Sequence, residues 1–138
     1  MPPRDTVPGA ARTALEREGW VITADPLVLP VGLHNLYVDL AAERVVAAQR
    51  GDEQIAVEIK SFRGRSEVAD LEQALGQFVL YRGILHRSEP RRQMVLAVPR
   101  SAWTSLFESE LGRTAREELS LVVVVFDPVR EEVWQWFR

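Results

Sequence analysis

The sequence contains no cysteine, only two histidines and no long apolar run. The lack of cysteine excludes disulfides and thiolate zinc sites. The two histidines, His34 and His86, are too few for a metal centre built from imidazoles. A bound metal would therefore be a hard cation held by carboxylate oxygens. No window approaches the roughly 18–20 apolar residues that span a bilayer. The first residues also lack the apolar core of a signal peptide, so we expect a cytoplasmic protein with no membrane contact.

An excess of positive charge is also missing. Seventeen lysines and arginines face twenty acidic residues, which gives a formal charge of −3. Proteins that coat nucleic acid through bulk charge are usually basic, so this balance argues against that class. A local basic face stays open, although a solvated surface is the simpler account of most arginines. The candidates for such a face are Arg63, Arg65, Arg82, Arg87, Arg91 and Arg92.

Lysine is nearly absent as well. Sixteen of the seventeen cationic residues are arginine, and Lys60 is the single lysine. An ammonium is a compact point charge with an adjustable pKa, whereas a guanidinium is a wide fork that stays charged. A site that needs an ammonium would resist replacement by arginine, so Lys60 is a candidate functional residue.

The apolar pattern predicts one α/β domain over residues 1–138. A chain of 138 residues with 46% hydrophobic and 27% charged residues can bury one core. The predicted order α-β-β-β-α-β-α-β-β implies a mixed β-sheet flanked by α-helices. The expected helices are 6–18, 66–85 and 101–119, and the expected strands are 20–23, 36–40, 44–49, 54–62, 94–98, 121–126 and 132–137.

Three local assignments are less regular. Segment 25–35, with two prolines and a glycine, is assigned as partly extended and partly loop. Segment 50–53 is assigned as a turn, and strands 36–40 and 44–49 could form one long bent strand. The helix over 101–119 is expected to turn Trp103, Leu106, Phe107 and Leu111 inward.

Glu58 and Lys60 form the chemical centre that the pattern suggests. Side chains alternate along strand 54–62, so both project from the face opposite Ile55, Val57 and Ile59, roughly 6–7 Å apart at their backbones. A carboxylate beside an ammonium can hold a divalent cation, while the ammonium orients or deprotonates a water or neutralises charge on a phosphate. The alternative is a solvated ion pair on the wet face of an antiparallel strand.

A metal site here would need a second acid. Asp39 is the first choice because it interrupts an otherwise apolar strand. With a tight turn at Gly51 and a regular register, however, the residue opposite Lys60 would lie near Glu43. Asp39 would then reach the site only through a bend or bulge near 41–42, which is common beside active sites. We therefore expect Asp39 and Glu58 to bind Mg²⁺ or Mn²⁺, with Glu43 as the alternative to Asp39.

Gln77 and Tyr81 lie four residues apart, on one face of the helix that follows. The order Asp39, Glu58-x-Lys60 and Gln77-x-x-x-Tyr81 resembles the PD-(D/E)xK superfamily of metal-dependent nucleases. The resemblance implies a restriction-endonuclease-like fold with these five residues in catalysis. Gln77 would contact the DNA backbone or position the nucleophile, and Tyr81 would support it.

The same resemblance implies an additional metal-site acid at Glu16 in the first helix. Each of these residues also has a purely structural alternative. Gln77 and Tyr81 could form a polar helix edge with a half-buried tyrosine, and Glu16 could be a solvated glutamate beside Arg17.

Trp134 and Trp136 are expected on one face of the last strand. They could form a stacking platform for bases. A place in the core or in a subunit contact is the commoner role of such a pair, and we favour it.

The chain also resembles the XisH family from end to end. The matching stretches are ALEREGW (14–20), DPL (25–27), YVDL (37–40), IAVEIKSF (55–62), ALGQF (74–78), LAVP (96–99), FDP (126–128) and VWQW (133–136). One departure is Pro8, which stands where the resemblance implies a histidine after Arg4-Asp5.

Membership of that family implies a factor that controls the site-specific excision of a DNA element. The implied partners are DNA, a small XisI-like protein and a separate site-specific recombinase. Three activities are open: a divalent-metal-dependent deoxyribonuclease, a non-catalytic accessory protein that binds the XisI-like partner, and a toxin-like nuclease restrained by that partner. A homo-oligomer is open as well.

Overall fold

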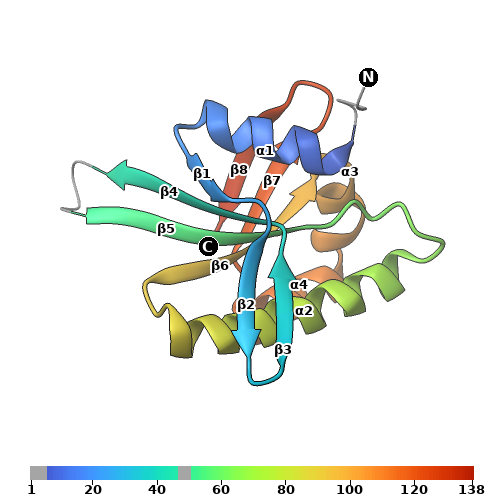
Figure 1. Cartoon of the computed structure of the whole chain (residues 1–138). Coiled ribbons are helices and arrows are strands. Elements are labelled where there is room, and N and C mark those ends of the chain that lie inside the picture. Colours follow the sequence, from blue (N-terminus) through green and yellow to red (C-terminus); the bar gives the residue numbers. More distant parts are fainter. Residues whose placement is uncertain (1–5, 47–50) are drawn as a thin grey trace.

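The computed structural model describes residues 6–46 and 51–138 (Figure 1). The helical elements are α1 (Val7–Arg17), α2 (Glu67–Ser88), α3 (Arg100–Ala102), the π-helical turn η2 (Trp103–Phe107) and α4 (Glu110–Leu119). The strands are β1 (Val21–Ala24), β2 (Leu27–Val31), β3 (His34–Val38), β4 (Leu40–Val46), β5 (Gly51–Ile59), β6 (Arg92–Pro99), β7 (Val123–Asp127) and β8 (Glu132–Phe137).

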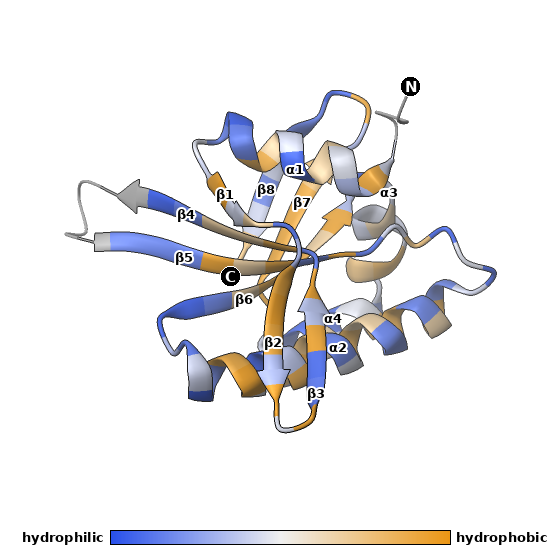
Figure 2. Cartoon of the chain, in the orientation of Figure 1, coloured by the Kyte–Doolittle hydropathy of each residue, from blue (hydrophilic) through white to orange (hydrophobic). Residues whose placement is uncertain are grey.

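A six-stranded mixed sheet in the order β1-β4-β5-β6-β7-β8 forms the centre of the molecule. β5, β6 and β7 run parallel, and the strands outside them are antiparallel to their neighbours. α1 covers one face, and α2 with the η2–α4 segment covers the other (Figure 1). Strands buried on both faces are apolar almost throughout, as the orange of β7 shows in Figure 2. The expected α/β fold with a mixed sheet flanked by helices is confirmed.

α1 begins and ends close to its predicted bounds. The Thr6 side chain accepts a hydrogen bond from the Gly9 amide and caps the helix. Pro8 lies in the first turn, where a missing amide hydrogen costs nothing. Gly19 follows the helix at a φ of +96°, which favours glycine. No helix in the described part of the chain is long and apolar enough to cross a membrane.

Segment 25–35, predicted as partly extended and partly loop, forms most of a β-hairpin. β2 and β3 pair in register from Leu27 opposite Val38 to Val31 opposite His34, around a two-residue turn at Gly32 and Leu33. Pro26 precedes β2, and Pro30 is compatible with β2 because that strand has no second neighbour. One face of the hairpin, including Leu29, packs into the core beside α2. The hairpin projects from the main sheet in Figure 1.

The single helix predicted over 101–119 is interrupted. η2 ends at Phe107, and the side chain of Ser109 then accepts a hydrogen bond from the Gly112 amide and starts α4. This break rotates α4, so Leu111 is 47% exposed, and its predicted inward position is wrong. Trp103, Leu106 and Phe107 are buried as predicted.

The last strand contains a β-bulge that the alternation pattern did not predict. The register with β7 shifts between Val125, opposite Gln135, and Phe126, opposite Val133. A one-residue shift moves the following side chains to the other face. Trp136 therefore packs on the α1 side against Trp20, at a ring distance of 5.8 Å, and Trp134 lies with Phe137 instead. The prediction that both tryptophans share one face is wrong.

β5 begins earlier than predicted. β4 extends to Val46, and β5 begins at Gly51, so residues 51–53 belong to a strand. The predicted strand residues 47–49 and the turn residue Arg50 lie outside the described residues. β5 ends at Ile59, three residues before the predicted end at 62.

Gly112, near the start of α4, gives a direct test of how α4 packs against η2. A methyl group added there would meet the Leu106 carbonyl oxygen at 2.2 Å and the Phe107 Cα at 2.4 Å, and both are backbone atoms. We expect Gly112→Ala to lower the free energy of unfolding by about 1–3 kcal/mol in urea titrations. Gly76→Ala is the matched control: its methyl group meets no atom within 4 Å. It should raise the stability of the monomer by about 0.5–1 kcal/mol. Equal effects of the two variants would contradict the packing described for η2 and α4.

Candidate active site

The register of β4 and β5 brings Asp39 opposite Glu58. Leu40 pairs with Val57, so the residues next to them, Asp39 and Glu58, face each other across the two chains. The pairing is regular from Leu40 to Val46, and no bulge at 41–42 is needed. Glu43 pairs with Gln54, six positions before Lys60, so the predicted proximity of Glu43 to Lys60 is wrong. The error arose from assuming a tight turn at Gly51.

Backbone amides hold both carboxylates in place. The Ile59 amide donates to Asp39 Oδ2 at 2.7 Å, and the Asp39 amide donates to Glu58 Oε1 at 3.4 Å. Asp39 lies at the bend between β3 and β4, which frees its side chain from the regular alternation. These contacts join segments about twenty residues apart, and no local sequence pattern predicts them.

Lys60 completes the predicted strand motif. Its Nζ lies 3.9 Å from Glu58 Oε2, with side-chain exposures of 19% for Lys60 and 8% for Glu58. The Lys60 amide donates to the Ala97 carbonyl at 3.0 Å, which fixes the chain just beyond the end of β5. Glu58 is the one charged residue in the buried core of the described chain. The alternative of a solvated surface pair therefore does not hold.

The surroundings of Glu58 favour its neutral form. Burial and the adjacent charge of Asp39 raise the pKa of Glu58 to about 7, although the Lys60 ammonium opposes this shift. Removing two neighbouring carboxylates from water is costly, and one ammonium offsets only part of the cost. An additional positive charge beside the two carboxylates would therefore stabilise them.

α2 brings Gln77 and Tyr81 to the same place. Tyr81 is buried, and burial followed by the charge of Glu58 raises the pKa of its phenol, while a hydrogen bond with Gln77 lowers it. Gln77 Oε1 is buried and accepts no hydrogen bond from the described residues. The structure thus brings together the five residues that the sequence suggested, from the β3–β4 bend, the end of β5 and α2. Their catalytic roles stay predictions.

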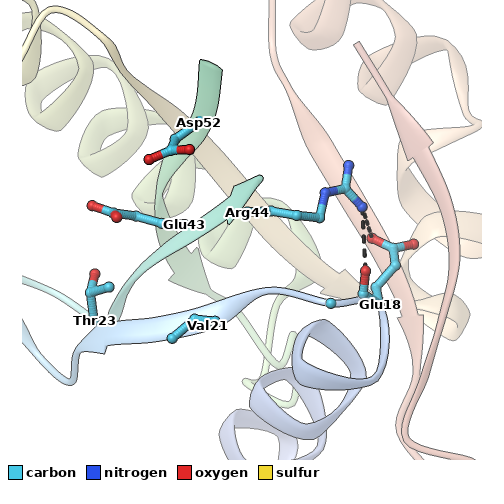
Figure 3. A pocket seen from close by; sticks show the side chains of 7 residues that line it. Glu18, Val21, Thr23, Glu43, Arg44 and Asp52 are labelled. Atoms are coloured by element: carbon cyan, nitrogen blue, oxygen red, sulfur yellow. Dashed lines mark hydrogen bonds and ion pairs between the residues drawn. The ribbon is translucent and has the colours of Figure 1, made fainter. Parts of the chain in front are cut away.

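Glu43 lies elsewhere. It forms an ion pair with Arg92 Nη2 at 3.5 Å and lines a hollow of about 600 Å³ between β1, β4 and β5. Figure 3 shows Glu43 with Asp52 at this hollow, while Arg44 extends away from them toward Glu18.

Glu16 also points to other partners. It forms an ion pair with Arg12 at 3.7 Å on α1, the helix on the face opposite α2, and its side chain is 50% exposed. Its position is that of the solvated glutamate considered above.

The family assignment follows from comparison with known proteins. The profile of a family described as XisH protein matches residues 1–134. The chain belongs to the XisH family. A crystal structure of an XisH family protein from Nostoc punctiforme is 38% identical to it, with a TM-score of 0.86 over 96% of this chain and 98% of the other.

A second XisH-like structure is described as an FdxN element excision controlling factor protein from Anabaena variabilis. It is also 38% identical, with a TM-score of 0.87 over 98% of this chain and 100% of the other. No curated protein matches the chain significantly. The XisH resemblance noted in the sequence is confirmed, and the likeness to PD-(D/E)xK nucleases stays a prediction.

The donor atoms in this XisH chain fit a hard divalent cation. The described residues contain no group of three or more acidic, histidine or cysteine side chains that could enclose a metal. Mg²⁺, however, is usually held by one or two carboxylates together with water and substrate phosphate. Asp39 and Glu58 would supply those carboxylates, which face each other across the two strands.

The raised pKa of Glu58 gives a pH-dependent prediction. Between pH 4.5, its ordinary pKa, and about 7, the unfolded chain has lost this proton and the folded chain keeps it. The contribution to stability is therefore complete below 4.5 and is lost as the pH rises to about 7. The glutamine of the Glu58→Gln variant stays neutral at every pH. Without divalent cations, the free energy of unfolding of this variant at about pH 8.5 should therefore exceed that of the native chain by at most about 3 kcal/mol. The two chains should converge toward about pH 4 in urea titrations with chelator.

Glu53→Gln is the control with the opposite sign. Burial acts to raise the pKa of Glu53, but the hydrogen bond and charges of Arg44 and Arg138 outweigh it and lower that pKa. Removing this carboxylate should destabilise the chain at neutral pH, with the loss vanishing in acid. A Glu58→Gln chain that is less stable than the native chain throughout this range would contradict the burial of an uncompensated charge.

Proposed function

We propose that this XisH chain takes part in the controlled excision of a DNA element and cleaves DNA phosphodiesters with Mg²⁺ or Mn²⁺. The similarity to the Anabaena variabilis excision controlling factor supports the role in excision. The observation that carries the proposed chemistry is the facing pair of Asp39 and Glu58 with Lys60 3.9 Å from Glu58. Two carboxylates and an ammonium at a strand end suit hydrolysis of a phosphodiester.

Each side chain has a separate task in this proposal. Asp39 and Glu58 hold the cation, which when bound polarises the phosphate and makes a water more acidic. The Lys60 ammonium orients the attacking water or neutralises charge that builds on the phosphate. Gln77 directs its amide at the DNA backbone, and Tyr81, one turn farther along α2, supports it. The hydrogen bond from Ile59 keeps Asp39 aimed at the site before DNA arrives.

The test is cleavage of supercoiled and linear DNA with Mn²⁺ or Mg²⁺. Glu58→Gln and Lys60→Ala should lower the cleavage rate by at least about 100-fold, because each removes a group that acts on the reacting atoms. Lys60→Arg should also fail, since a planar guanidinium does not replace a compact ammonium. Glu43→Gln is the matched control, because that acid lies on the same strand pair but faces Gln54. Cleavage that survives Glu58→Gln, or depends equally on Glu43, would refute the assignment.

A second candidate function is supported by the β2–β3 hairpin. It exposes apolar residues on two parts of its surface: Val28 and Tyr37 lie on the face opposite Leu29, and Val31 and Leu33 lie near its tip. Exposed apolar groups on one projecting element are typical of protein contacts. The chain would then be a non-catalytic accessory protein that binds an XisI-like partner beside a recombinase, or a toxin-like nuclease that this partner restrains.

Hairpin variants separate these functions. Leu33→Asp with Tyr37→Asp should abolish co-purification with the XisI-like chain but leave metal-dependent cleavage unchanged. Glu58→Gln should have the opposite effects. Growth arrest on expression of the chain alone, relieved by Glu58→Gln and by the partner, would identify the restrained nuclease. Loss of partner binding in Glu58→Gln, with the hairpin variant still bound, would exclude the hairpin as the contact.

A further inference from the structure

The outer face of α2 is the side of the helix that the fold leaves uncovered. Its buried residues, from Leu71 to Leu85, form a stripe on the core. On the opposite side, an exposed row follows at spacings of four and three residues, which keeps it on one line along the helix. The row contains Glu72, Gly76, Val79, Gly83 and His86, with Leu80 and Arg87 beside it.

This row has a symmetry that a second copy of the chain would match. Val79 and Leu80, which are 40% and 54% exposed, lie at its centre. Gly76 and Gly83 lie at equal distances on either side of the Val79–Leu80 peptide bond. Glu72 and Arg87 are also equidistant from it, farther out, and their charges are opposite. An antiparallel copy centred on that bond would therefore set apolar residues against each other, glycine against glycine, and each glutamate against an arginine.

The charges on this face are unused within the chain. Other ionic groups of α2 have partners: Glu67 accepts from Ser105, Asp70 from the Gly64 amide, and Arg82 donates to the Leu119 carbonyl. Glu72 and Arg87 have no ion pair or hydrogen bond to any residue of the described chain. Opposite charges at the two ends of one uncovered face are complementary in the antiparallel arrangement only.

The two glycines are not required by the fold. Each is exposed in the interior of a 22-residue helix, where glycine is less favourable than alanine. A methyl group at either position would meet no atom within 4 Å. Small residues two turns apart let the backbones of two helices approach closely.

We propose that two copies of the chain associate through α2, packed antiparallel about a two-fold axis at the Val79–Leu80 bond. The same helix carries Gln77 and Tyr81 on its inner side, so this contact would hold two Asp39–Glu58 sites in a fixed, two-fold relation. Such a pair of sites suits the two strands of a duplex. The dimer itself requires no catalytic activity.

Sedimentation velocity over a concentration series tests the association. The native chain should form dimers, and Leu80→Glu should weaken them by more than about tenfold, because each interface would bury unpaired charge. Gly76→Leu should also weaken the dimer while it raises the melting temperature of the dilute monomer. A role of Gly76 in the monomer fold alone would lower that temperature instead. A native chain that stays monomeric at every concentration overturns the proposal.

A charge exchange tests the geometry. Glu72→Arg and Arg87→Glu should each weaken association by roughly two- to tenfold, and the double variant should restore it, because both symmetry-related pairs are then reversed. Two additive losses would exclude this register. Unchanged association in all three variants would place the contact on another surface.

The absence of cysteine allows a direct distance test. Oxidation of a mixture of Gly76→Cys and Gly83→Cys chains should produce a disulfide between different copies, because the proposed approach meets the short Cα separation that the bond needs. A mixture of Gly76→Cys and Glu72→Cys is the out-of-register control and should remain reduced. Equal cross-linking in both mixtures would mean random collision and would overturn the proposal. Circular dichroism confirms that each variant is folded.

Discussion

The antiparallel pairing of β4 with β5 holds Asp39 against Glu58, and the rest of the site is arranged around that contact. Because side chains alternate along a strand, a register one residue different would turn Glu58 and Lys60 toward α1 and separate them from Gln77. β5 is also bound on its other side to β6, and Lys60 is tied to Ala97 just beyond the strand. The register is thus fixed from both sides, and the geometry of the site is a property of the whole sheet.

The same arrangement is costly for the folded chain without a bound cation. Burial and the neighbouring Asp39 raise the pKa of Glu58 to about 7, so near neutral pH the site is poised between two protonation states. A cation would offset the repulsion between the carboxylates, which links metal binding to stability and to pH. Such destabilising groups are common at functional sites, because the side chain that destabilises the protein without its ligand is often the one that binds the ligand.

Much of this molecule could be predicted from the sequence, because apolar periodicity and capping residues act locally. The helix capped by Ser66 and the buried strands around Val95 and Val124 follow from such patterns, whereas the clustering of acid, lysine and glutamine was expected from the nuclease resemblance. Some misses come from misleading local signals, and others depend on pairing between distant segments. Prolines disguised the β2–β3 hairpin, and the Gly51-Asp52 pair suggested a turn inside what is a strand. A bulge against β7 turned Trp134 away from Trp136. The choice between Asp39 and Glu43 depended on register, which no short pattern fixes.

The β2–β3 hairpin has a mechanical consequence for the carboxylate beside it. Val38 is the last residue of β3, and Asp39 follows directly at the bend that leads into the main sheet. The far end of the hairpin carries Leu33 fully in solvent, with a relative exposure of 102%. A molecule that binds this tip would contact the element that leads directly into Asp39. If binding displaced the hairpin, the spacing between the Asp39 and Glu58 carboxylates would change, and so would their affinity for a cation.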